Sequence, residues 1–474
     1  MTLQLFIILL YFVITIIIGI IAQRKSNSAA TFHGMGLGVT TCVCAATGEW
    51  LGGSATTGVA EYGFDIGIAG AMNTITNALG IFVLAIFFVK MYWGYKSITV
   101  PGIIGKLLGD KAKKTSSWLL IFVMVAVGIS QMIAAGSLAV SVMDINFKTA
   151  VASCAVVFII YTLLGGMNAV AYTNVLHLMT MYFGAVVALV LALRNVGGYS
   201  VVTESLPESY FNFTTVGYPQ LLSWTIASVL GACTAQAGLQ PVFAAKSDRV
   251  ARKASVITAL IVAPFGILSA LLGMTAKTMS LKGTLLNASG ELVTVGKLAL
   301  PTLMMTLSPI VGGILLASIL AAVLSTVSPL ILSSGTMYAK DIYALRHPGT
   351  SDKKLLLVSR AATAVAGVVM ASLAIILNAL NMRVLDIVYV GFTMRAALFI
   401  ILMLAIKWKR TSERATIYAM IGTIVVGVFW VSYKAVTGHN PISTEFTETY
   451  AAIITAFVII IVCSYIFPNK REIF

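Results

Sequence analysis

Two adjacent hydroxyl side chains, Ser325 and Thr326, lie inside an apolar stretch that runs from about Leu300 to Ser334 and contains no charged residue. In a helix, such hydroxyls can hydrogen-bond the backbone carbonyl one turn back. A hard cation is the alternative partner, because it prefers a cage of oxygen ligands. The pair therefore predicts either local backbone bonding or a cation site.

Two opposite charges, Glu49 and Arg395, fall near the middle of other apolar segments. An isolated charge at that depth of a membrane costs at least about 2.5 kcal/mol, so each needs a partner or a wet cavity. One interpretation is a shared cavity in which Arg395 binds a solute carboxylate bidentately. The others are a structural ion pair between the two, or a cation or proton site at Glu49. Trp50 forms a wall of the ligand site or simply packs.

Several polar side chains within the apolar segments have two interpretations each. Gln131 and Gln236 either orient a polar ligand or hydrogen-bond neighbouring helices. His177, one turn after Asn174, either relays a proton or bridges groups at the membrane interface. We find no paired carboxylates, nucleophile elbow or phosphate-binding loop in the sequence, which argues against an enzyme and against a nucleotide-driven pump.

The composition predicts a polytopic membrane protein. Hydrophobic residues make up 59% of the 474 residues, charged residues 10%, and the mean hydropathy is +0.97. A soluble domain of this composition would have a mostly apolar surface. The net charge of +15 is concentrated in short clusters between apolar segments, which is typical of topology signals rather than of nucleic-acid binding. The five cysteines all fall in apolar segments and show no disulfide or metal-ligand spacing.

The hydropathy pattern predicts an all-α protein of about thirteen transmembrane helices. With the N-terminus outside and the C-terminus in the cytoplasm, roughly two-thirds of the Lys and Arg lie inside, as the positive-inside rule favours. The first segment reads as a retained helix rather than a signal peptide. The loop at about 196–218 is an outer gate or a plain connector. The expected spans are 3–22, 36–60, 66–92, 116–143, 148–164, 171–195, 219–245, 254–276, 300–335, 355–380, 384–407, 414–436 and 448–467.

Two of these spans are poorly suited to a continuous helix. The second packs Gly48, Gly52 and Gly53 around Glu49, and the seventh combines glycines, a polar run and Pro241. The two spans are five apart, so they cross in opposite directions. Broken helices at corresponding places in two halves are typical of inverted-repeat transporters, in which unwound backbone can bind ions and solute.

Four motifs, in this order, resemble those of the solute:sodium symporter family, over about residues 5–465. Its members include sodium–proline, sodium–galactose and sodium–sialate transporters. Ser97-Ile-Thr-Val-Pro101 stands where the family has a Thr-x-Pro-Glu-Phe-like segment. The other matches are Gly165 to Asn174 with Gly-Gly-x-x-Ala-Val-x-Trp-Thr-Asp, Gln240 to Ser247 with Gln-x-x-x-Ala-Ala-Lys-Ser, and Ala321 to Thr326 with the segment that supplies the sodium-site hydroxyls.

The resemblance implies a leucine-transporter-type fold, five plus five inverted helices with flanking helices, in a single transporter domain over residues 1–474. Residues 3–35 would be an extra N-terminal helix and loop, 36–215 the first repeat, 216–410 the second, and 411–474 C-terminal flanking helices. It also implies a sodium ion held by five neutral oxygens: the Ser325 and Thr326 hydroxyls and the carbonyls of Ala322, Cys44 and Thr47.

The sequence departs from the family pattern at two cation-site positions and at the solute site. Asn174 replaces the family's intramembrane Asp, and Pro329 stands where some relatives use a further serine, so we expect a single sodium. Where sugar transporters carry Asn and Tyr, this chain has Ser228 and Gly231. Such small residues do not suit a sugar. The solute-binding residues are expected to be Glu49, Trp50, Gln131, Ser228, Gly231, Gln236 and Arg395.

These observations predict a sodium-coupled symporter of the plasma membrane that imports a small carboxylate or amino-acid-like solute by alternating access. Its partners would be the solute, sodium and the lipid bilayer, with no nucleic acid, and it would be a monomer or weak oligomer. The alternative is a proton-coupled transporter of the same fold using Glu49 or His177. A channel or sensor is favoured less, because the sequence shows neither repeated polar rings nor an output domain.

Overall fold

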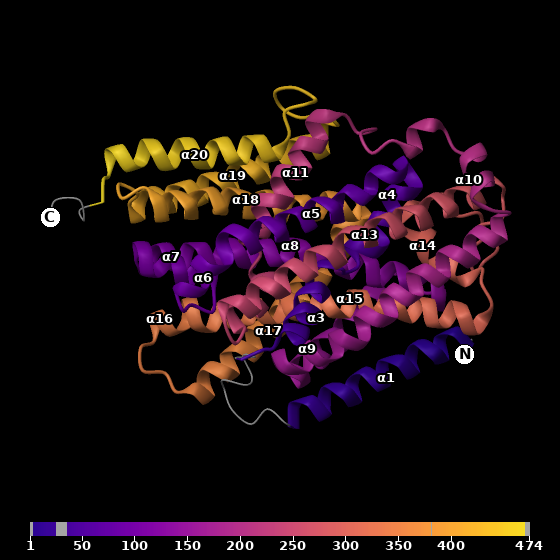
Figure 1. The fold of residues 1–474 in the computed structure, drawn as a ribbon, viewed down its shortest axis with the longest axis horizontal. Coiled ribbons are helices and arrows are strands. Elements are labelled where there is room, and N and C mark those ends of the chain that lie inside the picture. The colour runs from indigo at the N-terminus through magenta and orange to yellow at the C-terminus, as the bar shows by residue number, and fades with distance from the viewer. Residues whose placement is uncertain (1–2, 25–35, 381, 470–474) are drawn as a thin grey trace.

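The computed structural model describes residues 3–24, 36–380 and 382–469, and its described part consists of helices joined by loops and turns, with two isolated β-bridges. Figure 1 shows the helices running roughly along the long axis of the molecule, with the start of α1 and the end of α20 at opposite ends. The helices are α1 (Leu3–Arg24), α3 (Val39–Trp50), η1 (Ser54–Gly58), α4 (Val59–Ile66), η2 (Gly67–Ala71), α5 (Met72–Val83), η3 (Leu84–Phe88), α6 (Val89–Gly94), α7 (Val100–Leu108), α8 (Asp110–Met143), α9 (Phe147–Val196), α10 (Tyr199–Ser205), η4 (Glu208–Phe211), α11 (Tyr218–Ala232), α12 (Gln236–Ala244), α13 (Asp248–Leu281), α14 (Gly296–Met305), α15 (Pro309–Met337), η5 (Tyr338–Tyr343), α16 (Ala344–Arg346), α17 (Asp352–Ala379), α18 (Val384–Lys407), α19 (Glu413–Thr437) and α20 (Glu448–Ile466).

Among the described residues, ten helical stretches are long and apolar enough to cross a membrane, and two shorter apolar helices cover Leu3–Ile18 and Phe147–Leu163. The stretch Ser54–Gly94 reverses direction at Gly67, where a φ of +83° favours glycine. Residues 54–66 therefore complete the pass that α3 begins. Large apolar side chains are exposed along α1, α9, α17 and α20, where they would face lipid. These ten long and two shorter apolar stretches confirm the expected class, an all-helical membrane protein.

Helix α9 contains 50 residues, yet it cannot be a single straight rod. The Tyr161 and Thr173 hydroxyls lie 2.7 Å apart, whereas twelve residues of straight helix would place the two Cα atoms about 18 Å apart, more than the two side chains span. The helix therefore bends sharply between these residues, between the two spans predicted from the sequence.

The two expected breaks are present. Helix α3 ends at Trp50, the backbone of Leu51–Gly53 is not helical, and a π-helical turn follows. In the other half, α11 ends at Ala232 and α12 begins at Gln236, with Cys233–Ala235 between them. In Figure 1, α3 and α4 run toward the right-hand end, whereas α5 leads back to α6 and α7 at the left-hand end.

One predicted span needs correction. The expected pass at 300–335 combines the short helix α14 with the membrane-length helix α15, which starts only at Pro309. Ser308 and Pro309 favour a new helix start, because proline is well tolerated in the first turn. The loop at 196–218 contains α10 and η4, and Tyr210 in it donates to the carbonyl of Asp65.

Candidate functional site

The Ser325–Thr326 pair lies where the middle of α15 meets the end of α3. The Ser325 hydroxyl donates to the carbonyls of Ala322 (2.8 Å) and Gly48 (3.0 Å). The Thr326 hydroxyl lies 2.6 Å from the same Gly48 carbonyl. Both side chains are 1% exposed. The Ser325 hydroxyl thus bonds its own helix, as one interpretation of the sequence has it, and both hydroxyls join α15 to α3.

Glycines allow the close approach of the two helices at this point. A Cβ at Gly52 would come within 2.3 Å of the Thr326 hydroxyl oxygen. A Cβ at Gly48 would come within 2.2 Å of the Asn174 amide nitrogen. Asn174 thus adjoins the hydroxyl pair, and neither its amide oxygen nor its amide nitrogen has a hydrogen-bond partner among the described residues.

These oxygens suit a hard, monovalent cation. The oxygen atoms that could act as ligands here are those of two hydroxyls and of the Ala322 and Gly48 carbonyls, and all of them are neutral. The described residues contain no group of three His, Cys, Asp or Glu that could hold a metal ion. The nearby carbonyl is that of Gly48 rather than Thr47, whose carbonyl accepts the Leu51 amide within the helix end. Cys44 lies one turn earlier on α3 and is buried, and its carbonyl remains a predicted ligand.

His177 lies in the contact between α9 and α1. Its Nδ1 is 2.7 Å from the Tyr11 hydroxyl, and the ring is fully enclosed at 1% exposure. The Nε2 atom has no partner in the described chain. This geometry ties α9 to the first helix.

Glu49 and Arg395 line one small cavity of about 10 Å³ together with Gln236. The Glu49 Oε2 and the Arg395 Nε and Nη2 atoms are buried without a hydrogen-bond partner among the described residues. The guanidinium lies 4.2 Å from the ring centre of Phe392 and 5.7 Å from that of Trp50. Buried charges without partners are costly. Glu49 and Arg395 attract each other electrostatically across this cavity, which in this arrangement has room for about one water molecule.

The neighbouring broken helix α11–α12 packs tightly around this cavity. A Cβ at Gly231 would meet the Phe392 carbonyl at 2.9 Å and the Arg395 Cβ at 3.4 Å. A Cβ at Gly238 would meet the Trp50 ring at 2.9 Å. Ser228, one turn before Gly231, is fully buried, and its carbonyl faces α5. Gly231 thus adjoins Arg395, whereas Ser228 lies against α5.

The two glutamines have their amide groups engaged with backbone. Gln131 accepts the Gly53 amide at 2.6 Å and so holds the unwound end of the first broken helix. Gln236 accepts the Val100 amide at 2.8 Å and donates to the Ile98 carbonyl at 3.1 Å. Both interactions match the helix-bridging interpretation of these side chains, while their predicted contact with solute remains a prediction.

A larger cavity, of about 590 Å³, was not predicted from the sequence. It lies toward the end of the molecule where α11 and α20 begin, and its lining mixes aromatic rings with charges. Trp224 stacks on Tyr389 at 5.2 Å between ring centres, and Tyr389 contacts Phe392 edge-on at 5.7 Å. One face of α18 therefore leads from this cavity, past Phe392, to Arg395. No local motif marks these residues, because they come from five helices.

Hydrogen bonds and an ion pair connect the second half of α4 to the start of α18 beside this cavity. Glu61 accepts the Val384 amide at 2.9 Å, Tyr62 donates to Asp386, and Arg383 pairs with Asp65 at 3.2 Å. On α14, which lies outside the membrane-spanning stretches, burial lowers the pKa of Lys297, and the carboxylates of Glu61 and Asp65 partly offset this.

The chain is similar to known transporters over most of its length. The Sodium:solute symporter family profile matches residues 32–427. The sodium/mannose cotransporter of Bos taurus is 25% identical over 73% of this chain and 64% of that protein, so the chain spans slightly less than two-thirds of that relative. The high-affinity proline transporter of Bacillus subtilis is 23% identical over 88% of this chain and 90% of that protein. The solved structure of a Na⁺-coupled sialic acid symporter, in a substrate-bound outward-open state, superposes with a TM-score of 0.80 at 17% identity and covers 99% of both chains.

The fold is that of a multi-pass membrane protein of the leucine-transporter type, and the family profile identifies a transporter, not an enzyme. With the family profile matched over most of its length, the chain belongs to the sodium:solute symporter family. This confirms the family resemblance drawn from the four motifs.

Proposed function

We propose that this protein is a sodium-coupled symporter of the plasma membrane that imports a small carboxylate or amino-acid-like solute by alternating access. The observation that carries the proposal is that Glu49 and Arg395 line one cavity at the two broken helices, and that each has buried side-chain atoms without a hydrogen-bond partner among the described residues. A zwitterion would satisfy both charges at once. A planar guanidinium is well suited to hold its carboxylate.

Sodium would bind where α3 meets α15. Its ligands would be the Ser325 and Thr326 hydroxyls and the carbonyls of Ala322 and Gly48, with Cys44 and Thr47 on the same helix end as the further predicted ligands. A cation shared by the two helices would stabilise the state in which they are in contact. It would couple to solute transport only through its different affinity for the two access states.

A single sodium per cycle is favoured. Asn174 lies beside Gly48 and supplies an amide where a carboxylate would add negative charge. Pro329 provides no hydroxyl on the next turn of α15. The neutral donor set therefore supports one monovalent cation.

The first test is tracer uptake of a panel of amino acids, carboxylates and sugars by proteoliposomes, driven by a sodium gradient or by a proton gradient. We expect sodium-driven uptake of a carboxylate-bearing solute, and at least a tenfold loss in the Ser325→Ala/Thr326→Ala variant, which removes two ligands. Ser318→Ala is the matched control, because that hydroxyl bonds only its own helix, two turns earlier on α15. It should retain uptake.

Two outcomes would contradict the proposal. Uptake driven by protons alone, with the double variant unimpaired, would exclude the sodium site and make Glu49 or His177 the coupling group. Uptake of neutral sugars, unaffected by Arg395→Lys, would show that the cavity does not select a carboxylate.

A further inference from the structure

Gln236 occupies a position between two parts of the molecule. It is the first residue of α12, directly after the break, and it lines the same cavity as Glu49 and Arg395. Its amide nevertheless bonds a different segment: it accepts the Val100 amide at 2.8 Å and donates to the Ile98 carbonyl at 3.1 Å. The side chain is 2% exposed. Gln236 thus lines the cavity, and its amide also bonds the chain at the start of α7.

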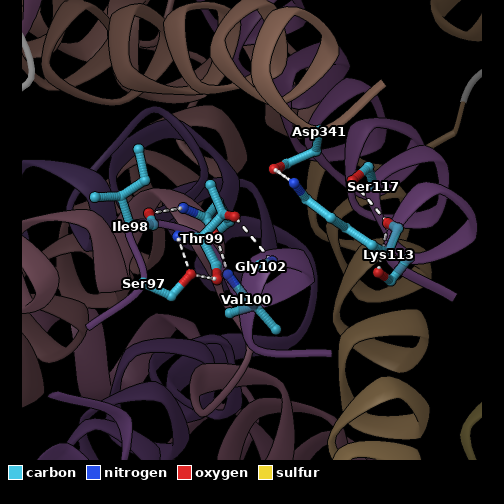
Figure 2. A network of polar contacts seen from close by, with 10 residues as sticks. Ser97, Ile98, Thr99, Val100, Gly102, Lys113, Ser117 and Asp341 are labelled. Atoms are coloured by element: carbon cyan, nitrogen blue, oxygen red, sulfur yellow. Dashed lines mark hydrogen bonds and ion pairs between the residues drawn. The ribbon is translucent and has the colours of Figure 1, made fainter. Parts of the chain in front are cut away.

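The segment that Gln236 holds is itself well ordered by local bonds. Thr99 caps α7 by accepting the Gly102 amide at 3.0 Å, and the Ser97 hydroxyl donates to the Thr99 carbonyl at 2.9 Å. Figure 2 shows these bonds beside a second contact, the ion pair between Lys113 of α8 and Asp341 of η5, at 3.1 Å. Helix α7 packs against α8. The segment is therefore part of a closed layer that joins α7, α8 and η5 at one end of the molecule.

Farther from the break, α12 is also bonded to the chain before α3 and to α15. The Ala244 carbonyl accepts the amides of Gly36 and Leu37, at 2.7 and 2.9 Å. Gln240 accepts the Ser333 hydroxyl of α15 at 2.5 Å. Among these contacts of α12, the one made by Gln236 lies nearest the break and reaches the cavity. It is the contact that a bound solute can disturb directly.

We propose that Gln236 is a positioning residue that couples occupancy of the central cavity to opening of the end formed by α7, α8 and α12, the cytoplasmic end in the proposed topology. This inference rests on the proposed symport function. In the closed state the amide oxygen accepts one bond, from Val100, and the amide nitrogen donates one, to Ile98, so one lone pair and one N–H are available to a solute. A solute that bonds these positions draws the amide toward the cavity and weakens its bonds to the segment that carries Ile98 and Val100. Solute binding and closure therefore compete for one side chain.

The test measures separation of this contact directly. Val100 is fully buried, so a cysteine there reacts with a membrane-impermeant maleimide only when α12 and the segment part. The background carries alanine at the five native cysteines and Val100→Cys, in inside-out vesicles. Gln236→Met keeps the length of the side chain and removes both bonds. We expect labelling without solute to rise about tenfold, the size expected for two lost hydrogen bonds. Addition of solute should accelerate it no further.

Two further variants make the result decisive. Gln236→Glu keeps the acceptor for Val100 and loses the donor to Ile98, so labelling should rise by a smaller factor; this variant decides the question if Gln236→Met does not yield monodisperse protein. Ser223→Ala breaks a buried hydroxyl pair with Thr447 near the other end of the same broken span. It should leave labelling unchanged.

The proposal is overturned if the Gln236 variants label at the rate of the parent while direct solute binding is lost, because Gln236 then serves the solute alone. It is also overturned if Ser223→Ala accelerates labelling equally, because the effect is then general loosening. Failure of symport itself would appear separately, as absence of sodium-driven uptake by the wild-type protein.

Discussion

Gly48 is the residue at which the cation site depends most closely on the absence of a side chain. A methyl group there would come within 2.2 Å of the Asn174 amide nitrogen and 3.2 Å of the Ser325 Cβ. Such overpacking typically costs about 1–3 kcal/mol. It would move α3 away from the hydroxyls of α15, and the Gly48 carbonyl with it.

We therefore expect Gly48→Ala to lower the apparent sodium affinity of uptake by about tenfold or more. The measurement is the sodium dependence of solute uptake at fixed solute. Gly94→Ala is the matched control, because a methyl group there meets nothing within 4 Å. Adding Asn174→Ala should partly restore the affinity by making room. An unchanged sodium affinity in Gly48→Ala would contradict the placement of the site.

At the scale of elements, the orientation of α18 depends on its start as well as on its packing. Glu61 of α4 accepts the amide of Val384, the first residue of α18, so it acts as a cap supplied by another helix. Helix α18 carries Arg395. The position of the guanidinium in the cavity thus depends in part on a carboxylate several turns away.

Glu61→Ala should lower stability by about 1–2 kcal/mol, the usual size for loss of a capping acceptor. It should also reduce uptake, because α18 loses its anchor to α4. Glu61→Gln keeps an acceptor oxygen and should be much milder. Thermal unfolding in detergent, read together with uptake, checks this. Glu204→Ala, at an exposed position of α10, is the control. Equal melting temperatures for Glu61→Ala and this control would refute the capping role.

For the whole molecule, the distribution of charge predicts the orientation in the membrane. Figure 1 places α6, α7 and α16 at one end and α10 and α14 at the other. The basic clusters around Lys106 to Lys114, Lys246 to Lys253 and Lys340 to Lys354 belong to the first of these ends. The positive-inside rule predicts that this end is cytoplasmic. The expected C-terminal charges Lys470 and Arg471 lie outside the described residues.

Single cysteines at two exposed positions test this orientation in a background without the native cysteines. In intact cells, an impermeant maleimide should label Ser209→Cys, in η4. It should label Ser351→Cys, before α17, only after permeabilisation, because that residue lies at the end predicted to be cytoplasmic. The reverse pattern would show that the N-terminus is inside.

Much of the architecture could be predicted because it depends on local composition. A run of about twenty apolar residues needs a lipid environment whatever surrounds it, so the number of passes is a property of the sequence. Glycine, proline and polar residues within such runs weaken a continuous helix. The breaks after Trp50 and after Ala232 were therefore predictable. The span at 300–335 was wrong in part, because hydropathy alone does not separate α14 from α15.

The sequence by itself determined that this is a membrane transporter with two broken helices, a buried hydroxyl pair and two buried opposite charges. Only the tertiary structure decided which groups meet. It brings the Gly48 carbonyl to Ser325 and Thr326, places Glu49 and Arg395 at one cavity, and turns the Gln236 amide toward Ile98 and Val100. These contacts join segments far apart in the chain. Their geometry depends on how whole helices pack, down to the absence of a single methyl group at Gly48, and no local pattern of residues encodes that.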